Sequence, residues 1–417
     1  MINGKREFEL LQKIGFIRTS GTEQEKQAAN ILLDEIKAIG HLGTIDAFNV
    51  KNAVIEEASF EVVEPYQKKY NVKGFTCSGN LDECIVDFKY VEDLNEVDLA
   101  DVKGKFILIN NRPTIKNFEK ICQSGAIGFM TFNGTVKDSD DESDLEERKL
   151  RANVKKYGTL PGLNILAKDA HEIVLNKASK VKVKLKQTEQ DFTSHNVMVS
   201  IQGTDYPLEE VNFCAHYDSV PFSTGVYDNG AGSVIIMELL RYYTQNPPKR
   251  TLNFMWFGSE EVGLEGSKHY VKTYQEQLKN QILTINVDVA GCVLGKDQAM
   301  VTADMSLVHH IDSLAKYHGL SLNVTQKVYS SDSTPFANAG VPAVSFARFG
   351  APGGAFIHCR HDVIDYLSAD SLAHTTKIVQ TFADTVVNAK VNPIVREMPE
   401  NMVKAVHEYL DIKEDKK

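Results

Sequence analysis

The sequence predicts an α/β fold of the three-layer αβα sandwich type. After about residue 190, short apolar runs alternate with stretches whose apolar residues recur at helical spacing. The strand-like runs include 211–215, 252–257 and 343–347, and the helical stretches include 233–243 and 307–317. Strands that alternate with helices form a sheet with helices packed on its faces. The alternation therefore indicates a layered α/β domain.

Length and composition are those of an ordinary globular protein. The chain has 417 residues, of which 42% are hydrophobic and 24% charged, and this length favours two domains. The formal net charge is −10, and no block rich in Lys and Arg interrupts the acidic balance. We therefore expect neither nucleic acid nor an anionic membrane as a partner. The oligomeric state stays open.

The N-terminus and the cysteines predict a cytoplasmic location. Charges at Lys5, Arg6 and Glu7 interrupt any apolar signal segment, and no window approaches the ~18 apolar residues of a membrane span. The six cysteines are scattered. Cys77 and Cys84 are spaced to allow a bond across a hairpin, but the set forms no disulfide framework. This usage is typical of a reducing compartment.

Two helices and a strand are predicted at the start of the chain. Apolar positions at helical spacing cover 2–18 and 22–39, and Thr22 followed by acidic residues is a plausible cap for the second helix. Residues 41–50 then read as a strand. From about residue 53 the pattern changes to many strand-like runs, with helices expected at 116–122 and 168–178.

Acidic and imidazole groups follow the two apolar runs at 211–215 and 252–257. His216 and Asp218 come after the first run, and Glu260 and Glu261 come after the second. Because the carboxyl ends of strands form the ligand crevice of an open α/β sheet, these groups are expected to meet there. Histidine with carboxylates suits Zn²⁺ or a similar divalent ion.

Each of these groups also has a plain structural interpretation. A single histidine at a strand end is usually structural, and a Glu-Glu pair is as often a solvated turn. Asp228, in an Asp-Asn-Gly sequence that opens the helix at 233–243, adds a third group at a corresponding place. The combination, rather than any single residue, predicts a metal site.

The motifs around these residues resemble those of a known family. In chain order they read HYDSVP, DNGAG, FGSEEVGLEGSKHYV, INVDVAG, SSDSTPF with GVPAVSF, and IHCRHD. They resemble the motifs of the co-catalytic two-zinc aminopeptidases, the group that contains aminopeptidase Y and the bacterial leucine aminopeptidases. The resemblance covers roughly residues 20–55 and 190–390. It implies a mixed sheet of about eight strands, a peptide substrate and two Zn²⁺ per chain.

The resemblance also implies which residues hold the two metal ions. His216 and Asp288 resemble the ligands of one ion. Glu261 and His358 resemble the ligands of the other. Asp228 resembles the carboxylate that bridges both, and the family has a cis peptide bond directly after it.

Two further residues take catalytic roles by the same resemblance. Glu260 resembles the general base, which takes a proton from the attacking water. Asp218, two residues after His216, is expected to accept the second N–H of that imidazole and fix its orientation. Adjacent Glu260 and Glu261 are expected on the loop after the strand, where one side chain binds metal while the other reaches water.

The sequence departs from the family pattern at two motifs. The usual Tyr-His-Thr is Ile357-His358-Cys359, and His361 is a rival ligand, although the spacing to Asp362 favours His358. The Ser-Asp-His of many relatives is Ser-Asp-Ser at 331–333. Tyr329 is a candidate donor to the oxyanion, with a plain surface tyrosine as the alternative.

The remaining segments complete the predicted domain organisation. Runs at 101–108, 125–128 and 160–163 resemble a protease-associated domain, a module that is commonly inserted in this family. We therefore expect a discontinuous catalytic domain at 1–55 and 190–390. A smaller β-rich α/β insert is expected at 56–189, and a charged C-terminal helix or tail at 391–417.

The expected activity is that of a zinc-dependent aminopeptidase acting on short peptides. One alternative is a glutamate-type carboxypeptidase, which should place several arginines near the substrate carboxylates, whereas Arg348 and Arg360 alone lie near the motifs. A second is an inactive receptor-like relative, as in the transferrin receptor branch. The intact ligand set and Glu260 argue against it.

Overall fold

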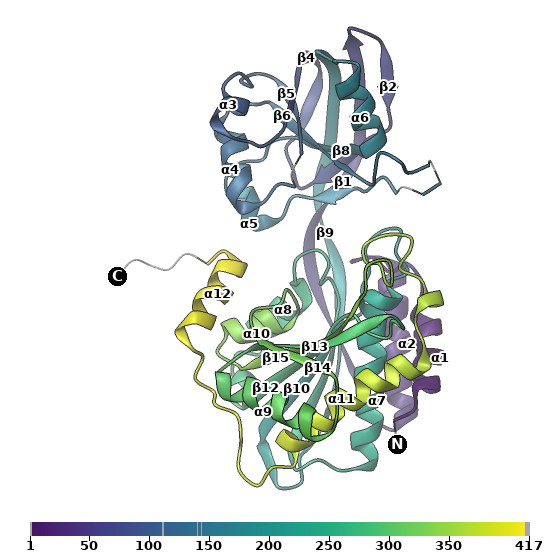
Figure 1. Ribbon diagram of the computed structural model, residues 1–417, viewed down its shortest axis with the longest axis vertical. Helices are drawn as coiled ribbons and strands as arrows, with labels where there is room; N and C mark the ends of the chain where they lie inside the picture. Colours follow the sequence, from purple (N-terminus) through teal and green to yellow (C-terminus); the bar gives the residue numbers. More distant parts are fainter. Residues whose placement is uncertain (1, 111, 140, 143, 413–417) are drawn as a thin grey trace. The chain divides into compact units, whose positions relative to one another are not determined.

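The chain divides into two compact units in the computed structural model, which describes residues 2–110, 112–139, 141–142 and 144–412 (Figure 1). The first unit comprises Met1–Val50 and Thr193–Lys417, and the second comprises Lys51–Phe192. These limits differ by a few residues from those expected at 55/56 and 189/190. Two long strands, β1 (Thr44–Glu64) and β9 (Lys180–Ile201), run across the limits, so the chain has no break in pattern there.

A mixed sheet forms the centre of the first unit. Its strand order is β14-β13-β15-β12-β10-β11-β9, and β1 pairs with β9. Besides β1 and β9, the strands of this sheet are β10 (Tyr206–His216), β11 (Arg250–Phe257), β12 (Gln281–Val287), β13 (Gly295–Thr302), β14 (Leu322–Gln326) and β15 (Ala343–Gly350). The neighbouring strands β11, β10, β12 and β15 run parallel to one another. At the two sides of this group, β9 runs antiparallel to β11, and β13 runs antiparallel to β15. The mixed sheet is therefore confirmed.

Helices cover both faces of this sheet, because alternate residues of its strands enter different cores. In β11, Phe254 and Trp256 join the larger core, whereas Met255 and Phe257 join a smaller core on the opposite face. The larger core holds residues of α1 (Gly4–Ile14), α2 (Glu23–Ile39), α7 (Ala231–Gln245), α9 (Met305–Tyr317) and α11 (Ala369–Val387). The smaller core holds residues of α8 (Glu265–Thr273) and α10 (Ser333–Asn338). The three-layer αβα sandwich is confirmed.

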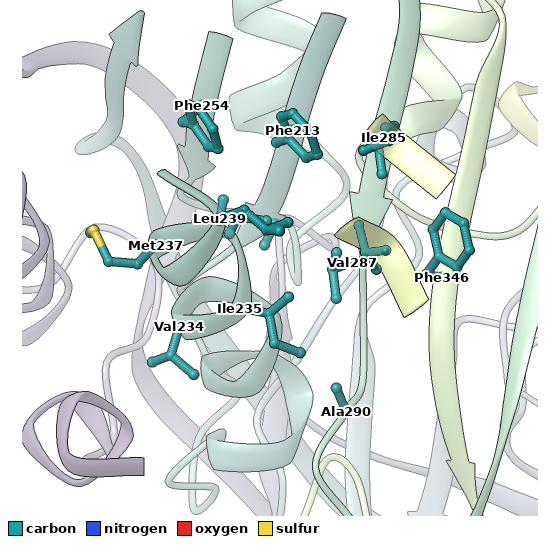
Figure 2. Close-up of a cluster of buried hydrophobic side chains, with 14 of the residues drawn as sticks. Phe213, Val234, Ile235, Met237, Leu239, Phe254, Ile285, Val287, Ala290 and Phe346 are labelled. Atoms are coloured by element: carbon teal, nitrogen blue, oxygen red, sulfur yellow. The ribbon is translucent and has the colours of Figure 1, made fainter. Parts of the chain in front are cut away.

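Packing under α7 fixes the helix that follows Asp228. Figure 2 shows Phe213 and Phe254 above this helix, and their rings stack with centroids 5.0 Å apart. Ile235 and Leu239 point from the helix toward the strands (Figure 2). These side chains are all buried, and burying one such side chain contributes roughly 1.5–3 kcal/mol.

The second unit is a smaller α/β module. Its strands lie in the order β9-β4-β5-β6-β8-β3-β7, and buried residues form two cores on this unit. Its strands are β2 (Lys68–Tyr70), β3 (Lys73–Thr76), β4 (Leu81–Val91), β5 (Phe106–Ile109), β6 (Gly128–Asn133), β7 (Arg148–Lys149) and β8 (Gly162–Leu166). Its helices are α3 (Glu96–Leu99), α4 (Ile115–Gln123), α5 (Ala152–Lys155) and α6 (Ala167–Leu175). A protease-associated identity for this unit stays a prediction.

The ends of the chain differ in detail from the expectation. The first helix, Gly4–Ile14, is shorter than 2–18: Asn3 caps its start by accepting hydrogen bonds from the N–H groups of Lys5 and Arg6, and the backbone leaves the helical conformation at Gly15. Thr22 caps α2 as predicted, accepting from the N–H of Glu25 at 3.2 Å. The last stretch contains α12 (Glu400–Leu410), which belongs to the first unit and buries Met402 and Val406, while 413–417 lie outside the described residues.

The described residues show the state of the cysteines and the apolar character of the helices. All six cysteines are free thiols, so Cys77 and Cys84 do not pair. Among the helices that the structure describes, none combines the length and the apolar character needed to cross a membrane.

Candidate metal centre

The predicted ligands lie at the carboxyl ends of neighbouring parallel strands. His216 is the last residue of β10, and Asp288 directly follows β12. Asp228 lies in the segment Val226–Gly230, where its own backbone is not helical (φ −119°, ψ 89°), directly before α7, and its peptide bond to Asn229 is cis. Glu261 follows β11 on a loop, and His358 lies on the loop after β15. The sheet topology therefore brings together residues that are up to 142 positions apart in the chain.

Asp228 connects two groups of ligand atoms. One of its oxygens, Oδ1, lies 3.2 Å from Nε2 of His216, which in turn lies 3.6 Å from Oδ1 of Asp288. Its other oxygen, Oδ2, lies 3.2 Å from Nε2 of His358, which lies 3.1 Å from Oε2 of Glu261. Each group offers three ligand atoms within 4.8 Å of one another. This geometry places one shared carboxylate between two potential cation sites.

Unpartnered carboxylate oxygens indicate that a cation fits here. Oε1 of Glu261 and Oδ1 of Asp288 are buried and accept no hydrogen bond from any residue that the structure describes. Leaving a buried acceptor unpaired costs about 1–3 kcal/mol, and more for a charged group. Two imidazoles and three carboxylates are also the donor set that Zn²⁺ and similar divalent ions prefer. The residues present therefore fit two divalent cations.

The electrostatics of the ligands support the same conclusion. Burial raises the pKa of Glu261 to about 7, and the nearby Asp228 carboxylate adds to this shift. Hydrogen bonds to Asp228 and Glu261 raise the pKa of His358 to about 11. A protonated imidazole thus supplies positive charge to carboxylates that repel one another. Because a metal ligand must be deprotonated, a divalent cation would replace such protons on binding.

Asp218 contacts both the first histidine and the loop that carries the two glutamates. Its Oδ1 lies 3.4 Å from Nδ1 of His216, but this nitrogen makes no hydrogen bond with the residues that the structure describes, so the role of Asp218 in orienting the imidazole stays a prediction. It also accepts hydrogen bonds from the N–H groups of Glu260, at 3.0 Å, and Glu261, at 3.3 Å. Sequence reasoning missed this second contact, because only the folded loop turns these two N–H groups toward Asp218.

Glu260 lies beside the ligands on the predicted loop. One of its oxygens lies within 4.8 Å of ligand atoms of His216 and Glu261. Burial is the largest influence on this carboxyl, and it raises the pKa of Glu260 well above the usual range. The role of Glu260 as a general base stays a prediction.

The structure also shows where His361, the rival ligand, and Tyr329, the candidate oxyanion donor, lie. His361 lies outside the ligand groups and packs against Phe356, with ring centroids 5.7 Å apart. Tyr329 is partly buried against Phe349, with centroids 5.8 Å apart. Burial raises the pKa of Tyr329, and the carboxylates of Asp288 and Asp228 raise it further. Tyr329 is therefore not a plain surface residue, and its role as an oxyanion donor stays a prediction.

Sequence reasoning missed two residues that hold the loop before α7. The guanidinium of Arg18 is fully buried and donates to the carbonyl oxygens of Tyr217, Thr224 and Gly225. Asp362 accepts from the N–H of Asp228 at 3.2 Å. Arg18 carried no signal beyond being an arginine in an apolar stretch, whereas Asp362 belongs to the IHCRHD motif that also carries His358.

Two potential cation sites that share one carboxylate, at the carboxyl ends of the parallel strands of a mixed sheet, have the arrangement of a two-metal centre. Residues 196–383 match the model of peptidase family M28. The resemblance drawn from the motifs is thereby confirmed.

Named proteins resemble this chain over different lengths. Aminopeptidase YwaD of Bacillus subtilis is 29% identical over 313 residues, which cover 70% of this chain and 65% of that protein. A vacuolar membrane protease of Kluyveromyces lactis is 38% identical over 100 residues, 24% of this chain and 11% of that protein. The chain thus spans less than two thirds of these relatives.

A solved structure matches nearly the whole chain. BSAP, a zinc aminopeptidase from Bacillus subtilis, superimposes with a TM-score of 0.79 at 22% identity, over 96% of this chain and 99% of that one. At this identity the likeness establishes the fold, in agreement with the three-layer sandwich described above.

Proposed function

We propose that this protein is a metal-dependent aminopeptidase that releases N-terminal residues from peptides with the help of two zinc ions. One observation carries the proposal: the two oxygens of Asp228 face two separate ligand groups, and Glu260 lies beside them. The match of residues 196–383 to the model of peptidase family M28 supports peptide hydrolysis. The names of two relatives, an aminopeptidase and a zinc aminopeptidase, support the reaction and the metal.

The ligand residues divide into two sets that share one carboxylate. His216 and Asp288 would hold one ion, Glu261 and His358 the other, and Asp228 both. When bound, two such cations polarise the scissile carbonyl and lower the pKa of water. The open arrangement of five ligands differs from the closed four-ligand cage of a structural zinc site.

Glu260 would act as the general base of the reaction. Its carboxylate takes a proton from the attacking water and then delivers it to the amine of the leaving peptide. Such a group contributes typically ~10²–10⁴-fold to the rate. The hydrogen bond from the N–H of Glu260 to Asp218 holds the base in place through its backbone.

The charged groups favour binding of the N-terminal end of a peptide. Carboxylates surround the centre, and they would attract a free α-amine and repel a terminal carboxylate. Arg348, one of two arginines near the motifs, already binds Asp297 at 2.6 Å and the carbonyl oxygen of Cys292 at 2.7 Å. This engagement weakens the alternative of a glutamate-type carboxypeptidase.

Hydrolysis of paired substrates tests this orientation. An unblocked leucyl anilide should be cleaved, and its N-acetyl counterpart should show a kcat/KM at least ~10²-fold lower, since acetylation removes the charge and the donors of the amine. The assay is run with zinc-loaded protein, and chelation followed by zinc readdition serves as the control. Comparable turnover of acetylated peptides, with release of the C-terminal residue, would establish the carboxypeptidase alternative instead.

The same assay addresses the alternative of an inactive receptor-like relative. Loss of catalysis in such a relative would be expected to show as a missing base or a missing ligand, whereas this chain keeps Glu260 and both ligand groups. Zinc-loaded protein that cleaves no peptide would favour the inactive relative. A cytoplasmic location remains a proposal, to which the free thiols lend support.

A further inference from the structure

The turn that carries the general base has an unusual backbone. Ser259, directly before Glu260, has a φ of 59°, a left-handed conformation that is uncommon for a residue other than glycine. Such a conformation persists when surrounding contacts hold it. Asp218 holds the N–H groups of the two glutamates that follow. The contacts on the other side of the turn come from the hydroxyl of Ser259.

That hydroxyl contacts the hydroxyl of Ser20 and also takes part in a buried chain of hydrogen bonds. Ser259 Oγ donates to Ser194 Oγ at 2.7 Å, and Ser194 Oγ donates to Oε1 of Glu25. The other oxygen of Glu25 accepts from the N–H of Gly21 at 2.8 Å. Ser259, Ser194 and Glu25 are all 0% exposed. The chain connects the first turn of α2 to the residue before the base.

The main chain of the turn also packs directly against this carboxylate. A Cβ atom built on Gly258 would lie 2.4 Å from Oε1 of Glu25 and 2.7 Å from Oγ of Ser194. Only a glycine fits at such a distance. Ser194 therefore meets the turn at both Gly258 and the hydroxyl of Ser259, whereas Glu25 meets it at Gly258.

We propose that Glu25, Ser194 and Ser259 are positioning residues for Glu260: their hydrogen-bond chain holds the turn so that the base meets the attacking water. The inference rests on the proposed function, since it needs Glu260 to be the base. A displacement of a reacting group by about 1 Å can cost ~10²-fold in rate. A contact that fixes the residue next to the base is therefore expected to affect kcat.

A purely structural role is the alternative, and the chain offers a matched control for it. Thr376 on α11 donates a hydrogen bond to Oε1 of Glu7 on α1, and both residues are 0% exposed. Burial raises the pKa of Glu7 and of Glu25 to about 8 alike. This second pair of a hydroxyl and a buried carboxyl has the same chemistry but lies on helices that carry no ligand.

The test compares removal of the hydroxyl in the two pairs. Ser194→Ala should lower kcat about 10-fold or more, with KM within about twofold of wild type and two zinc equivalents retained. Ser259→Gly should behave similarly, because glycine adopts the left-handed backbone without penalty while the hydroxymethyl group that carries the hydroxyl is removed. Thr376→Val should lower the thermal midpoint but keep the wild-type kcat.

A double variant with Glu260→Gln distinguishes positioning of the base from other effects of Ser194→Ala. In the Glu260→Gln background, Ser194→Ala should cause no further loss of kcat, because the positioned group no longer accepts a proton. Additive losses, a wild-type kcat in Ser194→Ala, or an equal loss in Thr376→Val would overturn the inference.

Amide hydrogen exchange gives a readout that does not require activity. The N–H groups of Glu260 and Glu261 should exchange faster in Ser194→Ala than in wild type, and at the wild-type rate in Thr376→Val. Unchanged exchange in Ser194→Ala would also overturn the inference. If zinc-loaded wild type hydrolyses no peptide, the proposed function fails, while exchange still decides whether the chain holds the turn.

Discussion

Glu260→Gln is expected to lower kcat by at least ~10²-fold while the protein keeps its fold and its bound zinc. Glutamine has the same shape as glutamate, but its amide cannot take a proton from water. The N–H of residue 260 would still donate to Asp218, so the turn is expected to stay in place. Steady-state kinetics on zinc-loaded protein, together with elemental analysis, measure both quantities.

Glu261→Gln is the control for this result. Its Oε2 lies 3.1 Å from His358 in the second ligand group, so the substitution should weaken zinc binding before it affects any proton transfer. Saturating zinc should therefore restore part of the activity of Glu261→Gln and none of the activity of Glu260→Gln. If the two phenotypes were exchanged, the roles of base and ligand would have to be exchanged as well.

The second large effect is expected from Asp228→Asn. Each of the two carboxylate oxygens of Asp228 faces a different ligand group, and an asparagine keeps only one oxygen. The wild type should approach two zinc equivalents, and the variant should lose most of that content, since the shared ligand serves both ions. Metal analysis after dialysis against zinc measures the stoichiometry.

A substitution of the same kind elsewhere controls for the loss of one charge. Asp304 caps α9 by accepting from the N–H of Ser306, and asparagine is an equally good cap. Asp304→Asn should therefore keep two zinc equivalents and the wild-type stability. Retention of two equivalents in Asp228→Asn would contradict the bridging role of Asp228.

The ligand positions were open to prediction because strand ends leave a signal in the sequence. His216 is the last residue of β10 and Asp288 directly follows β12, and the carboxyl ends of parallel strands meet at one edge of a sheet, although the motif resemblance was what assigned Asp288 as a ligand. Asp228 precedes an apolar helix, so its place was also readable. The strand or helix that carries each of these groups also positions it, and such an element can be recognised from the nearby sequence.

The supporting residues were not open to prediction, because their roles depend on contacts between distant segments. Ser194 and Glu25 are 169 positions apart, and Arg18 and Gly225 are 207 apart. A serine in a strand or an arginine near a helix has the same appearance whether or not it meets a particular carbonyl or carboxylate. Only the folded chain shows which hydroxyl contacts which acid.

The limits of the two units were predicted to within a few residues for a related reason. Strands β1 and β9 continue through both units, so the alternation of apolar and polar residues does not stop where one core ends and the next begins. The C-terminal stretch was expected to be a charged helix or tail, and the structure shows helix α12, whose buried residues are Met402 and Val406.

Anomalous X-ray diffraction from crystals of the zinc-loaded protein, measured at the zinc absorption edge, tests the two-metal centre most directly. Two peaks should appear about 3.5–4 Å apart. One should lie among His216, Asp228 and Asp288, and the other among Asp228, Glu261 and His358. A single peak, or no peak at these residues under saturating zinc, would contradict a centre in which Asp228 bridges two ions.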